Sequence, residues 1–347
     1  MCGSMKSIEQ LKKSPYVSII IVNYNGAPFL PILFSSLEKQ TFKDFEVIFV
    51  DNASKDKSIK IAEDFSRKGG IKMKIIKLSQ NLGFCKGNNI GLNFAEGEYV
   101  VLLNNDTFVA PNWLEELVKC INSNEKIGIC QSKIINLRDK RIVLGNFKGV
   151  YGIKKRPLII HKSKYFEDFF YASGASLIIR KYLIPKLRYL FDEKQFTGDE
   201  DLSWRVRLLG YKIVTNVKSI CFHYQGYSSA LVTRNYIKLF SHTYNDEVRT
   251  FIKNYSITFI FKRFLIFFLI KFIESIYYTL ILRQPIIYSF FRGIIWNALN
   301  FSDTWREHLV VQKLRRVSDE KIEEYMLPYP AELYFWRLKI SKWRNRI

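Results

Sequence analysis

Cysteine is scarce in this chain and irregularly spaced. The 347 residues include five cysteines, Cys2, Cys85, Cys120, Cys130 and Cys221, and they show no paired spacing. Secreted domains that depend on disulfides carry denser and more regular cysteine patterns. We therefore expect free thiols in a reducing compartment.

Two further absences narrow the class of protein. Residues 1–16 are polar and charged and lack the apolar core of a signal peptide, so we expect the folded part of the chain to stay in the cytoplasm. The dinucleotide pattern G-x-G-x-x-G and the P-loop signature G-K-[ST] are also missing. These absences disfavour a nicotinamide enzyme or an ATPase.

Acidic residues are few relative to basic ones, 32 against 54, which leaves a formal net charge of +22. Such a charge indicates either nucleic acid or an anionic membrane surface as a partner. Zinc-finger and RNA-binding signatures are missing, and the aromatic residues lie in apolar runs instead of between basic residues on a polar face. We expect an anionic membrane surface and no nucleic acid, and keep a nucleic-acid-binding protein as a rival hypothesis.

The most informative stretch that is present covers residues 98–111. Its apolar run, 99–103, is too short for a typical helix and is consistent with a buried strand. The run ends in Asn104-Asn105-Asp106, so acceptor oxygens follow at the carboxyl end of a strand, where open α/β sheets bind their ligands. Pro111 then precedes an expected helix with acids in its early turns. We hypothesise that Asp106 holds a divalent cation against a bound diphosphate.

The same arrangement occurs at three earlier strands. Apolar runs at 16–22, 46–50 and 72–78 are each followed by polar residues, and apolar groups at helical spacing occur in 27–40 and 59–65. Strands that alternate with helices predict an α/β fold with a mostly parallel sheet. Any one polar cluster can serve as a turn or a helix N-cap, but four clusters at successive strand ends favour a ligand site. The candidate binding residues are Asn23, Asn25, Asp51, Asn52, Asn81, Gly83 and Asn105.

Four blocks of the sequence together resemble glycosyltransferase family 2. They are residues 17–25 (VSIIIVNYN), 50–56 (VDNASKD), 81–84 (NLGF) and 104–106 (NND). Their order and spacing are similar to the branch that contains rhamnosyl- and galactofuranosyltransferase-like enzymes. The resemblance covers residues 16–230 and implies a GT-A fold, a nucleotide-binding α/β sandwich. It also implies a nucleoside diphosphate sugar as donor, with Asn23, Asp51 and Asn81 in contact with the nucleotide.

The resemblance further implies a metal site. A lone histidine is ordinarily a structural residue, but the family has a histidine at the place of His223, and there it binds the cation or the diphosphate. Asp106 and His223 are thus implied to hold Mn²⁺ or Mg²⁺, for which carboxylate and imidazole are suitable ligands. Small residues at 172–176 lead into an expected strand ending at 180, either beneath the sugar or at a closely packed sheet crossing. Residues 131–170 are expected to be irregular, as an acceptor surface or as a plain surface excursion.

An acidic cluster at 198–201 precedes a helix that ends at Gly210. Acids at a helix start ordinarily serve as caps and dipole partners. Glycosyl transfer, however, needs a carboxylate that takes the proton from the attacking hydroxyl. The family register puts Asp199 in that role, with Asp201 as the second candidate and Glu200 left open.

The C-terminal third is rich in aromatic and aliphatic residues. Residues 264–282 approach the roughly 20 residues of a membrane span, but Lys271 and Glu274 interrupt them. One helical stripe collects Arg263, Phe267, Lys271, Glu274 and Tyr278. We expect an amphipathic helix that lies in the membrane interface or dips into it, followed by a second apolar block at 286–296. The alternative is a pair of helices packed on the catalytic domain or on a second subunit.

Three parts are therefore expected: an N-terminal extension (1–15), a GT-A catalytic domain (16–230) and a C-terminal helical, membrane-associating region (231–347). The tail from Arg306 has a helical pattern suited to a partner or a homo-oligomer. The expected activity is a metal-dependent, inverting transfer of a sugar to a hydroxyl of a lipid-linked or cell-surface glycan at the cytoplasmic face of the membrane. The rival hypothesis is a catalytically silent scaffold that binds glycan or membrane. Asn104 supports this hypothesis, because related patterns often carry an aspartate at that position.

Overall fold

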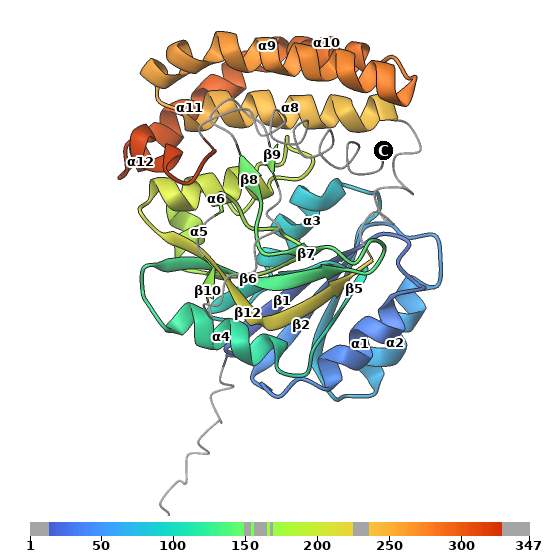
Figure 1. Cartoon of the computed structure of the whole chain (residues 1–347). Coiled ribbons are helices and arrows are strands. Elements are labelled where there is room, and N and C mark those ends of the chain that lie inside the picture. Colours follow the sequence, from blue (N-terminus) through green and yellow to red (C-terminus); the bar gives the residue numbers. More distant parts are fainter. Residues whose placement is uncertain (1–13, 149–153, 156–164, 167–168, 225–235, 328–347) are drawn as a thin grey trace, which may run out of the picture.

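The computed structural model describes residues 14–148, 154–155, 165–166, 169–224 and 236–327 (Figure 1). An α/β body built around a large sheet carries a layer of C-terminal helices on one side. The predicted α/β class is confirmed.

Four neighbouring parallel strands form the N-terminal half of the sheet. In sheet order they are β3 (Lys72–Lys77), β2 (Phe45–Asp51), β1 (Val17–Asn23) and β4 (Tyr99–Leu103). The first connecting helices are α1 (Leu30–Glu38), α2 (Ser58–Arg67) and α3 (Gly83–Leu92). All four strands and the first two helices lie where the apolar patterns predicted them.

Helix α3 was not predicted, because its many small residues give no apolar stripe. Its glycines allow it to pack closely on β1. A Cβ atom at Gly87 would lie 2.7 Å from Cγ1 of Val22, and one at Gly91 would lie 2.6 Å from Cγ2 of Ile20.

Strands β1, β2 and β4 are mostly apolar because helices cover both faces of the sheet there, whereas β3 lies at the sheet edge and is partly exposed. Ile19 and Ile21 of β1 pack with α1, α2 and α4 (Trp113–Asn122), whereas Ile20 packs into a second cluster with α3, α5 (Leu183–Lys186) and α6 (Asp199–Leu208). A strand buried on both faces reads as a continuous apolar run instead of an alternating one. This packing places the carboxyl ends of β1, β2 and β4 at one edge of the body.

The other half of the sheet is mixed. β11 (Ser176–Arg180) runs antiparallel between β4 and β6 (Ile127–Asn136). β12 (Lys212–His223) runs parallel to β6 and pairs antiparallel with β5 (Thr107–Val109). The short strands are β7 (Ile142–Val143), β8 (Phe147–Lys148), β9 (Lys154–Lys155) and β10 (Tyr165–Phe166). The expectation that residues 131–170 are irregular is therefore wrong for 131–136, which continue β6.

The expectation of free thiols is also wrong in part. Cys120 of α4 and Cys130 of β6 form a disulfide, although their spacing in the sequence gave no sign of pairing. Cys85 and Cys221 are free and buried. Cys2 lies outside the described residues.

The C-terminal helices form a layer above the body. They are α8 (Tyr236–Asn254), α9 (Ile257–Leu282), α10 (Ile286–Leu299), α11 (Phe301–Leu314) and α12 (Asp319–Glu323). Helix α8 lies between the body and the α9–α10 pair (Figure 1). A shared apolar cluster joins Trp204 of α6 to Phe251 of α8, Phe267 of α9 and Val311 of α11. The layer is therefore packed on the α/β body.

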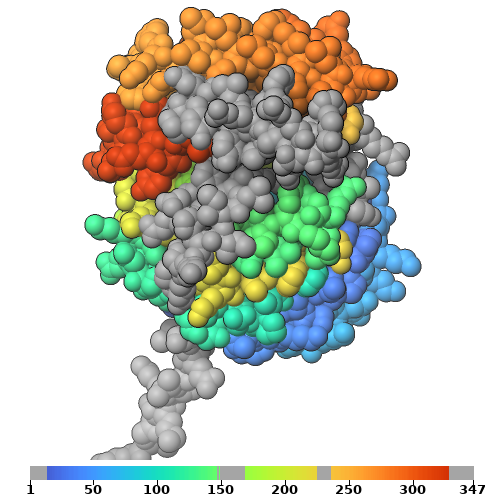
Figure 2. All heavy atoms as spheres, in the orientation of Figure 1, coloured from blue at the N-terminus to red at the C-terminus, as the bar shows by residue number. Residues whose placement is uncertain are grey.

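Helix α9 is the one described helix that is long and apolar enough to cross a membrane. It has 26 residues, a mean hydropathy of 1.9 over its most apolar window, and only 17% of that window buried. In the space-filling view, the orange atoms of the C-terminal helices form a broad band above the body (Figure 2).

Candidate functional site

A cavity of about 360 Å³ opens at the carboxyl ends of β1, β2 and β4. The four polar clusters that follow the predicted strands supply much of its wall, together with the start of α6 and the end of β12. The predicted site residues that line it are Asn52, Asn81, Gly83, Asn105, Asp106, Asp199 and His223. Residues far apart in the sequence thus meet in one concave, polar site.

Two of the expected nucleotide contacts, Asn23 and Asp51, lie behind the cavity wall. Both side chains are fully buried, and Nδ2 of Asn23 donates to Oδ1 of Asp51 at 3.0 Å. Oδ1 of Asn23 in turn accepts from Nδ2 of Asn105, which lines the cavity, at 2.8 Å. The other Asp51 oxygen accepts from the backbone N–H of Ser54 at 2.9 Å. These residues tie the loops after β1, β2 and β4 together.

Asn25 and Asn52 also bind neighbouring loops. Asn25 has a left-handed backbone with φ 51°, and its Oδ1 accepts from the backbone N–H of Lys55 at 2.7 Å. Oδ1 of Asn52 accepts from the N–H of Leu82 at 2.8 Å, and its Nδ2 donates to the carbonyl of Gly83 at 3.1 Å. Asn81 starts α3 by accepting the N–H of Gly83 at 2.9 Å. The side chains of Asn52 and Asn81 line the cavity.

The pairing of β5 with β12 brings Asp106 and His223 together. His223 lies opposite Thr107 in the ladder, and the backbone N–H of Tyr224 donates to the carbonyl of Asp106 at 2.9 Å. Nε2 of His223 lies 3.0 Å from Oδ1 of Asp106, and Nδ2 of Asn104 lies 3.4 Å from the same Nε2. Asp106 is only 3% exposed, so its carboxylate is fixed at the cavity wall.

The donor set fits a divalent cation shared with a substrate. Neighbouring ligands of an octahedral ion with bonds of about 2.1 Å are separated by about 3.0 Å, which is the Asp106–His223 separation. The described residues contain no group of three or more His, Cys, Asp or Glu side chains arranged to hold a metal ion. An ion here would complete its shell with water and phosphate oxygens, as Mg²⁺ commonly does.

Asp199 is the first residue of α6 and faces the cavity. Its Oδ2 accepts from the backbone N–H of Gly174 at 3.0 Å. A Cβ atom at Gly174 would lie 2.6 Å from Oδ1 of Asp199 and 2.9 Å from Cζ of Phe84. Glycine at 174 is thus required by close packing against the carboxylate, and its neighbours Ser173 and Ala175 also line the cavity.

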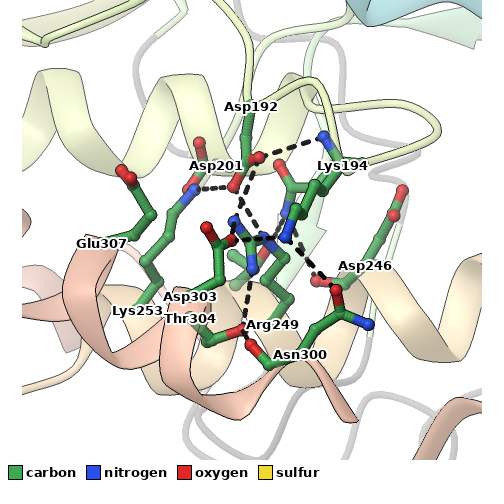
Figure 3. A network of polar contacts seen from close by, with 12 residues as sticks. Asp192, Lys194, Asp201, Asp246, Arg249, Lys253, Asn300, Asp303, Thr304 and Glu307 are labelled. Atoms are coloured by element: carbon green, nitrogen blue, oxygen red, sulfur yellow. Dashed lines mark hydrogen bonds and ion pairs between the residues drawn. The ribbon is translucent and has the colours of Figure 1, made fainter. Parts of the chain in front are cut away.

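The other two carboxylates of the acidic cluster lie outside the cavity lining. Asp201 is fully buried and lies 2.8 Å from Nε of Arg205. It also lies 2.9 Å from Nζ of Lys253, which Figure 3 shows beside it. Burial acts to raise the pKa of Asp201, but the charges of Arg205 and Lys253 outweigh it and hold that pKa below its usual value. Glu200 pairs with the buried Lys148. Of the three candidates, only Asp199 is therefore placed where a substrate can reach it.

Sequence reasoning missed part of the cavity wall. Phe196 and Thr197 line the cavity just before α6, and Tyr24 lines it after β1. Their closeness in sequence to Asp199 and Asn23 is the only signal that would have indicated them. Residues 225–228, which follow His223 in the expected metal-binding block, lie outside the described residues.

Comparison with known proteins finds a family model that matches a large part of the body. Residues 18–185 match the model of glycosyl transferase family 2. An uncharacterized glycosyltransferase of Haemophilus influenzae is 29% identical over 150 residues, which are 43% of this chain and 46% of that protein. The chain thus spans about half the length of this relative.

Solved structures share the fold. A crystal structure of GalNAc-T7 with UDP, GalNAc and Mn²⁺ has a TM-score of 0.55 at 20% identity, over 69% of this chain and 48% of that one. The mannosyltransferase PcManGT of Pyrobaculum calidifontis, in complex with GDP-Man and Mn²⁺, has a TM-score of 0.52 at 15% identity, over 87% of this chain and 86% of that one. At these identities the likeness establishes the fold, which is GT-A. In sequence, residues 18–185 of this chain are therefore similar to glycosyl transferase family 2.

Proposed function

We propose that this protein transfers a sugar from a nucleoside diphosphate sugar to a hydroxyl group of an acceptor, with a divalent cation and with inversion. The observation that carries the proposal is that Asp199 and the Asp106–His223 pair face one cavity. Much of the remaining cavity wall comes from residues 18–185, the stretch that matches the family 2 model. Structures of the same fold contain UDP or GDP-Man together with Mn²⁺, which supports this class of donor. The rhamnosyl or galactofuranosyl character expected from the sequence remains part of the proposal.

The residues divide into a donor side and an acceptor side. Asn52, Asn81 and Asn105 present amide groups to a nucleotide, with Asn23 and Asp51 holding their loops in place. Asp106 and His223 would hold Mn²⁺ or Mg²⁺, which when bound offsets the negative charge that develops on the departing diphosphate.

Asp199 acts on the acceptor side as the general base. It takes the proton from the attacking hydroxyl, the acceptor oxygen forms a bond to the anomeric carbon, and the bond from that carbon to the diphosphate oxygen breaks with its electron pair. A single displacement from the face opposite the leaving group inverts the anomeric configuration. The start of α6 suits an anionic carboxylate, because the first turn of a helix is electropositive.

A ligand-binding experiment tests the donor class. The full chain is heated with a panel of sugar nucleotides, with and without Mn²⁺, because a ligand that binds the folded state raises the melting temperature. We expect one nucleotide family to stabilise the protein and Mn²⁺ to increase that effect. If none of the panel stabilises the protein and none is turned over, the silent scaffold replaces the proposed enzyme.

We further propose that α9 and α10 rest on the cytoplasmic face of an anionic membrane, where a lipid-linked acceptor would be presented. The polar stripe of α9 points into the protein: Lys271 lies 2.9 Å from Glu247 of α8, and Arg263 lies 2.8 Å from Glu323 of α12. The opposite stripe is apolar and exposed, and it consists of Phe261, Leu265, Leu269, Ile273, Ile276 and Leu280.

The charges around this face suit anionic headgroups. The fully described helices α9 and α10 contain a single acid, Glu274, whose side chain is 15% exposed and pairs with Lys271. Their exposed charged residues are Lys262 and Arg292, and Arg283 is exposed in the connection between them. Because the polar stripe is bound to α8 and α12, a shallow interfacial position suits α9 better than a span.

A further inference from the structure

The loop that precedes Asp199 is bound by helices outside the matched family domain. This loop, residues 192–198, runs directly into α6, and Phe196 and Thr197 within it line the cavity. It lies outside helices and strands, so several of its backbone groups depend on side chains for hydrogen bonds. Side chains of α3 contact Glu193 in this loop, and those of α8 and α11 bind other parts of it.

Helix α8 presents a stripe to this loop at intervals of three or four residues. The ring of His242 stacks on Phe196 with centroids 4.8 Å apart, and Oγ1 of Thr250 accepts from Nε2 of Gln195 at 2.6 Å. Arg249 and Lys253, which are one helical turn apart, bind the carboxylate of Asp192 at 2.8 and 2.7 Å (Figure 3). Since residues four apart lie on one helical face, a single face of α8 binds the loop at both of its ends.

Asp246, in the middle of this stripe, holds the part of the loop that faces the cavity. Its carboxylate accepts the backbone N–H of Phe196 at 2.9 and 3.0 Å and the backbone N–H of Thr197 at 3.0 Å. The hydroxyl of Thr197 also donates to it, at 3.3 Å. Two consecutive cavity-lining residues are thus fixed by one carboxylate, through charge-assisted hydrogen bonds.

We propose that Asp246 is a positioning residue for the acceptor side of the cavity. It sets the place of Phe196 and Thr197, and through them the approach of a hydroxyl to Asp199. The donor-side groups are held differently, by contacts within the α/β body: Asn52 by Leu82 and Gly83, and Asp106 by His223. The assignment of Asp246 to the acceptor side rests on the proposed glycosyl transfer. The hydrogen bonds by which Asp246 holds Phe196 and Thr197, which we call the clamp, do not depend on that proposal.

Hydrogen–deuterium exchange tests the clamp without any activity. In Asp246→Ala, the amides of Phe196 and Thr197 lose a charged acceptor, and we expect their exchange to become about tenfold faster or more. Asp246→Asn keeps one acceptor oxygen and is expected to restore most of the protection. Asp319→Asn is the matched control, because Asp319 lies in the same helical layer and accepts the backbone N–H of Ser256 at 3.0 Å, away from the cavity.

Kinetics then test the acceptor side. The probes are the stabilising sugar nucleotide as donor and octyl glycosides as hydroxyl-bearing acceptors. We expect Asp246→Ala to lower kcat/KM for the octyl glycoside by about 10- to 100-fold, because misplaced groups lose effective molarity. KM for the donor, and the stabilisation by nucleotide with Mn²⁺, should match wild type. Asp319→Asn should change melting temperature alone.

The outcomes separate the two proposals. Unchanged exchange at Phe196 and Thr197 in Asp246→Ala overturns the clamp, whatever the activity. Faster exchange with equal losses on donor and acceptor sides overturns the assignment to the acceptor side. If wild type itself turns over no donor, the proposed function fails, while faster exchange in Asp246→Ala still supports the clamp.

Discussion

Nε2 of His223 lies 3.0 Å from Oδ1 of Asp106, although the two residues are 117 positions apart in the chain. The β5–β12 ladder produces this contact by placing His223 opposite Thr107, the neighbour of Asp106. The pair therefore forms only when β5 and β12, which are far apart in the chain, are assembled side by side. It gives the cavity one carboxylate and one imidazole at a separation suited to a shared cation.

We expect Asp106→Asn and His223→Ala to remove the Mn²⁺-dependent part of stabilisation by UDP or GDP. Each change removes one of the two ligands that we propose for the cation, and the remaining one cannot replace it. The measurement is the melting temperature with nucleotide, with and without Mn²⁺. Asp44→Asn serves as the control, because this carboxylate is bound to the exposed N–H of Tyr16 at 3.2 Å, remote from the cavity lining. Full Mn²⁺ dependence in both variants would exclude the site.

Asp199→Asn should impair turnover, whereas Asp201→Asn should impair the stability of the fold. Asp199→Asn is expected to lower kcat by about 10²- to 10⁴-fold, which is the acceleration that a general base typically provides. Nucleotide binding and stability should match wild type. Asp201→Asn leaves Arg205 and Lys253 without a fully buried anion and should cost about 3 kcal/mol of unfolding free energy. Urea unfolding and nucleotide release in the presence of octyl glycosides distinguish the two. Normal turnover in Asp199→Asn would reassign the base.

The sequence predicted the N-terminal half of the sheet well, because β1, β2 and β4 are buried on both faces and read as clear apolar runs. It did not predict β12, because Lys212, Thr215, Asn216 and Lys218 interrupt any simple apolar pattern in that strand. The contact between His223 and Asp106 depends on that strand, so from the residues alone the pair could only be inferred by resemblance. The disulfide was missed for the same reason, since α4 and β6 bring Cys120 and Cys130 together in space.

The polar stripe of α9 was recognised from its periodicity, but its direction was not. Periodicity states which residues share a face and leaves open what that face contacts. Lys271 faces Glu247 because α8 lies beneath α9, and the residues of α8 were not predicted as a helix. Asp246 was missed for the same reason: its partners are backbone N–H groups, which carry no sequence signal.

Gly174→Ala should lower activity more than its effect on stability would suggest. The added Cβ would lie 2.6 Å from Oδ1 of Asp199, so the carboxylate or the backbone at 174 must move. Such overpacking typically costs about 1–3 kcal/mol. Gly70→Ala is the matched control, because no atom lies within 4 Å of a Cβ at Gly70. Unchanged turnover in Gly174→Ala would show that the site has room to adjust.

The ion-pair cluster below α8 should make stability fall in acid. Burial acts to raise the pKa of Asp192, but Lys253 and Arg249 outweigh it and hold that pKa below its usual 3.8, and Asp201 is shifted in the same direction. A carboxylate with a depressed pKa stabilises the fold above its unfolded pKa, and this stability is lost as the pH falls through the folded value. We expect urea midpoints to drop between about pH 5 and about pH 2.

Asp192→Asn tests that assignment. Its urea midpoint should be lower than wild type at neutral pH and should change less in acid, because one of the titrating groups has been removed. Asp64→Asn, which removes an exposed pair with Arg67, should leave the wild-type profile unchanged. An identical acid response in Asp192→Asn would place the titrating groups elsewhere.

The exposed stripe of α9 should govern membrane binding. Phe261 and Leu265 are 81% and 68% exposed, so the double change to Asp removes apolar contact with lipid and costs the fold little. We expect Phe261→Asp/Leu265→Asp to abolish flotation of the full chain with vesicles of phosphatidylcholine and phosphatidylglycerol. Ile32→Asp, an equivalent change at a 42% exposed position of α1, should float like wild type.

A second set of flotation measurements distinguishes attraction to charged headgroups from insertion of apolar side chains. Each basic residue near an anionic surface contributes about 1 kcal/mol to binding, so reversing Lys262, Arg283 and Arg292 to Glu should weaken flotation most at low salt. Pure phosphatidylcholine should bind wild type less than the anionic mixture does. If the apolar double variant still floats, this face does not govern membrane binding. If wild type forms a dimer that the double variant cannot form, the face binds a second copy of the chain instead of lipid.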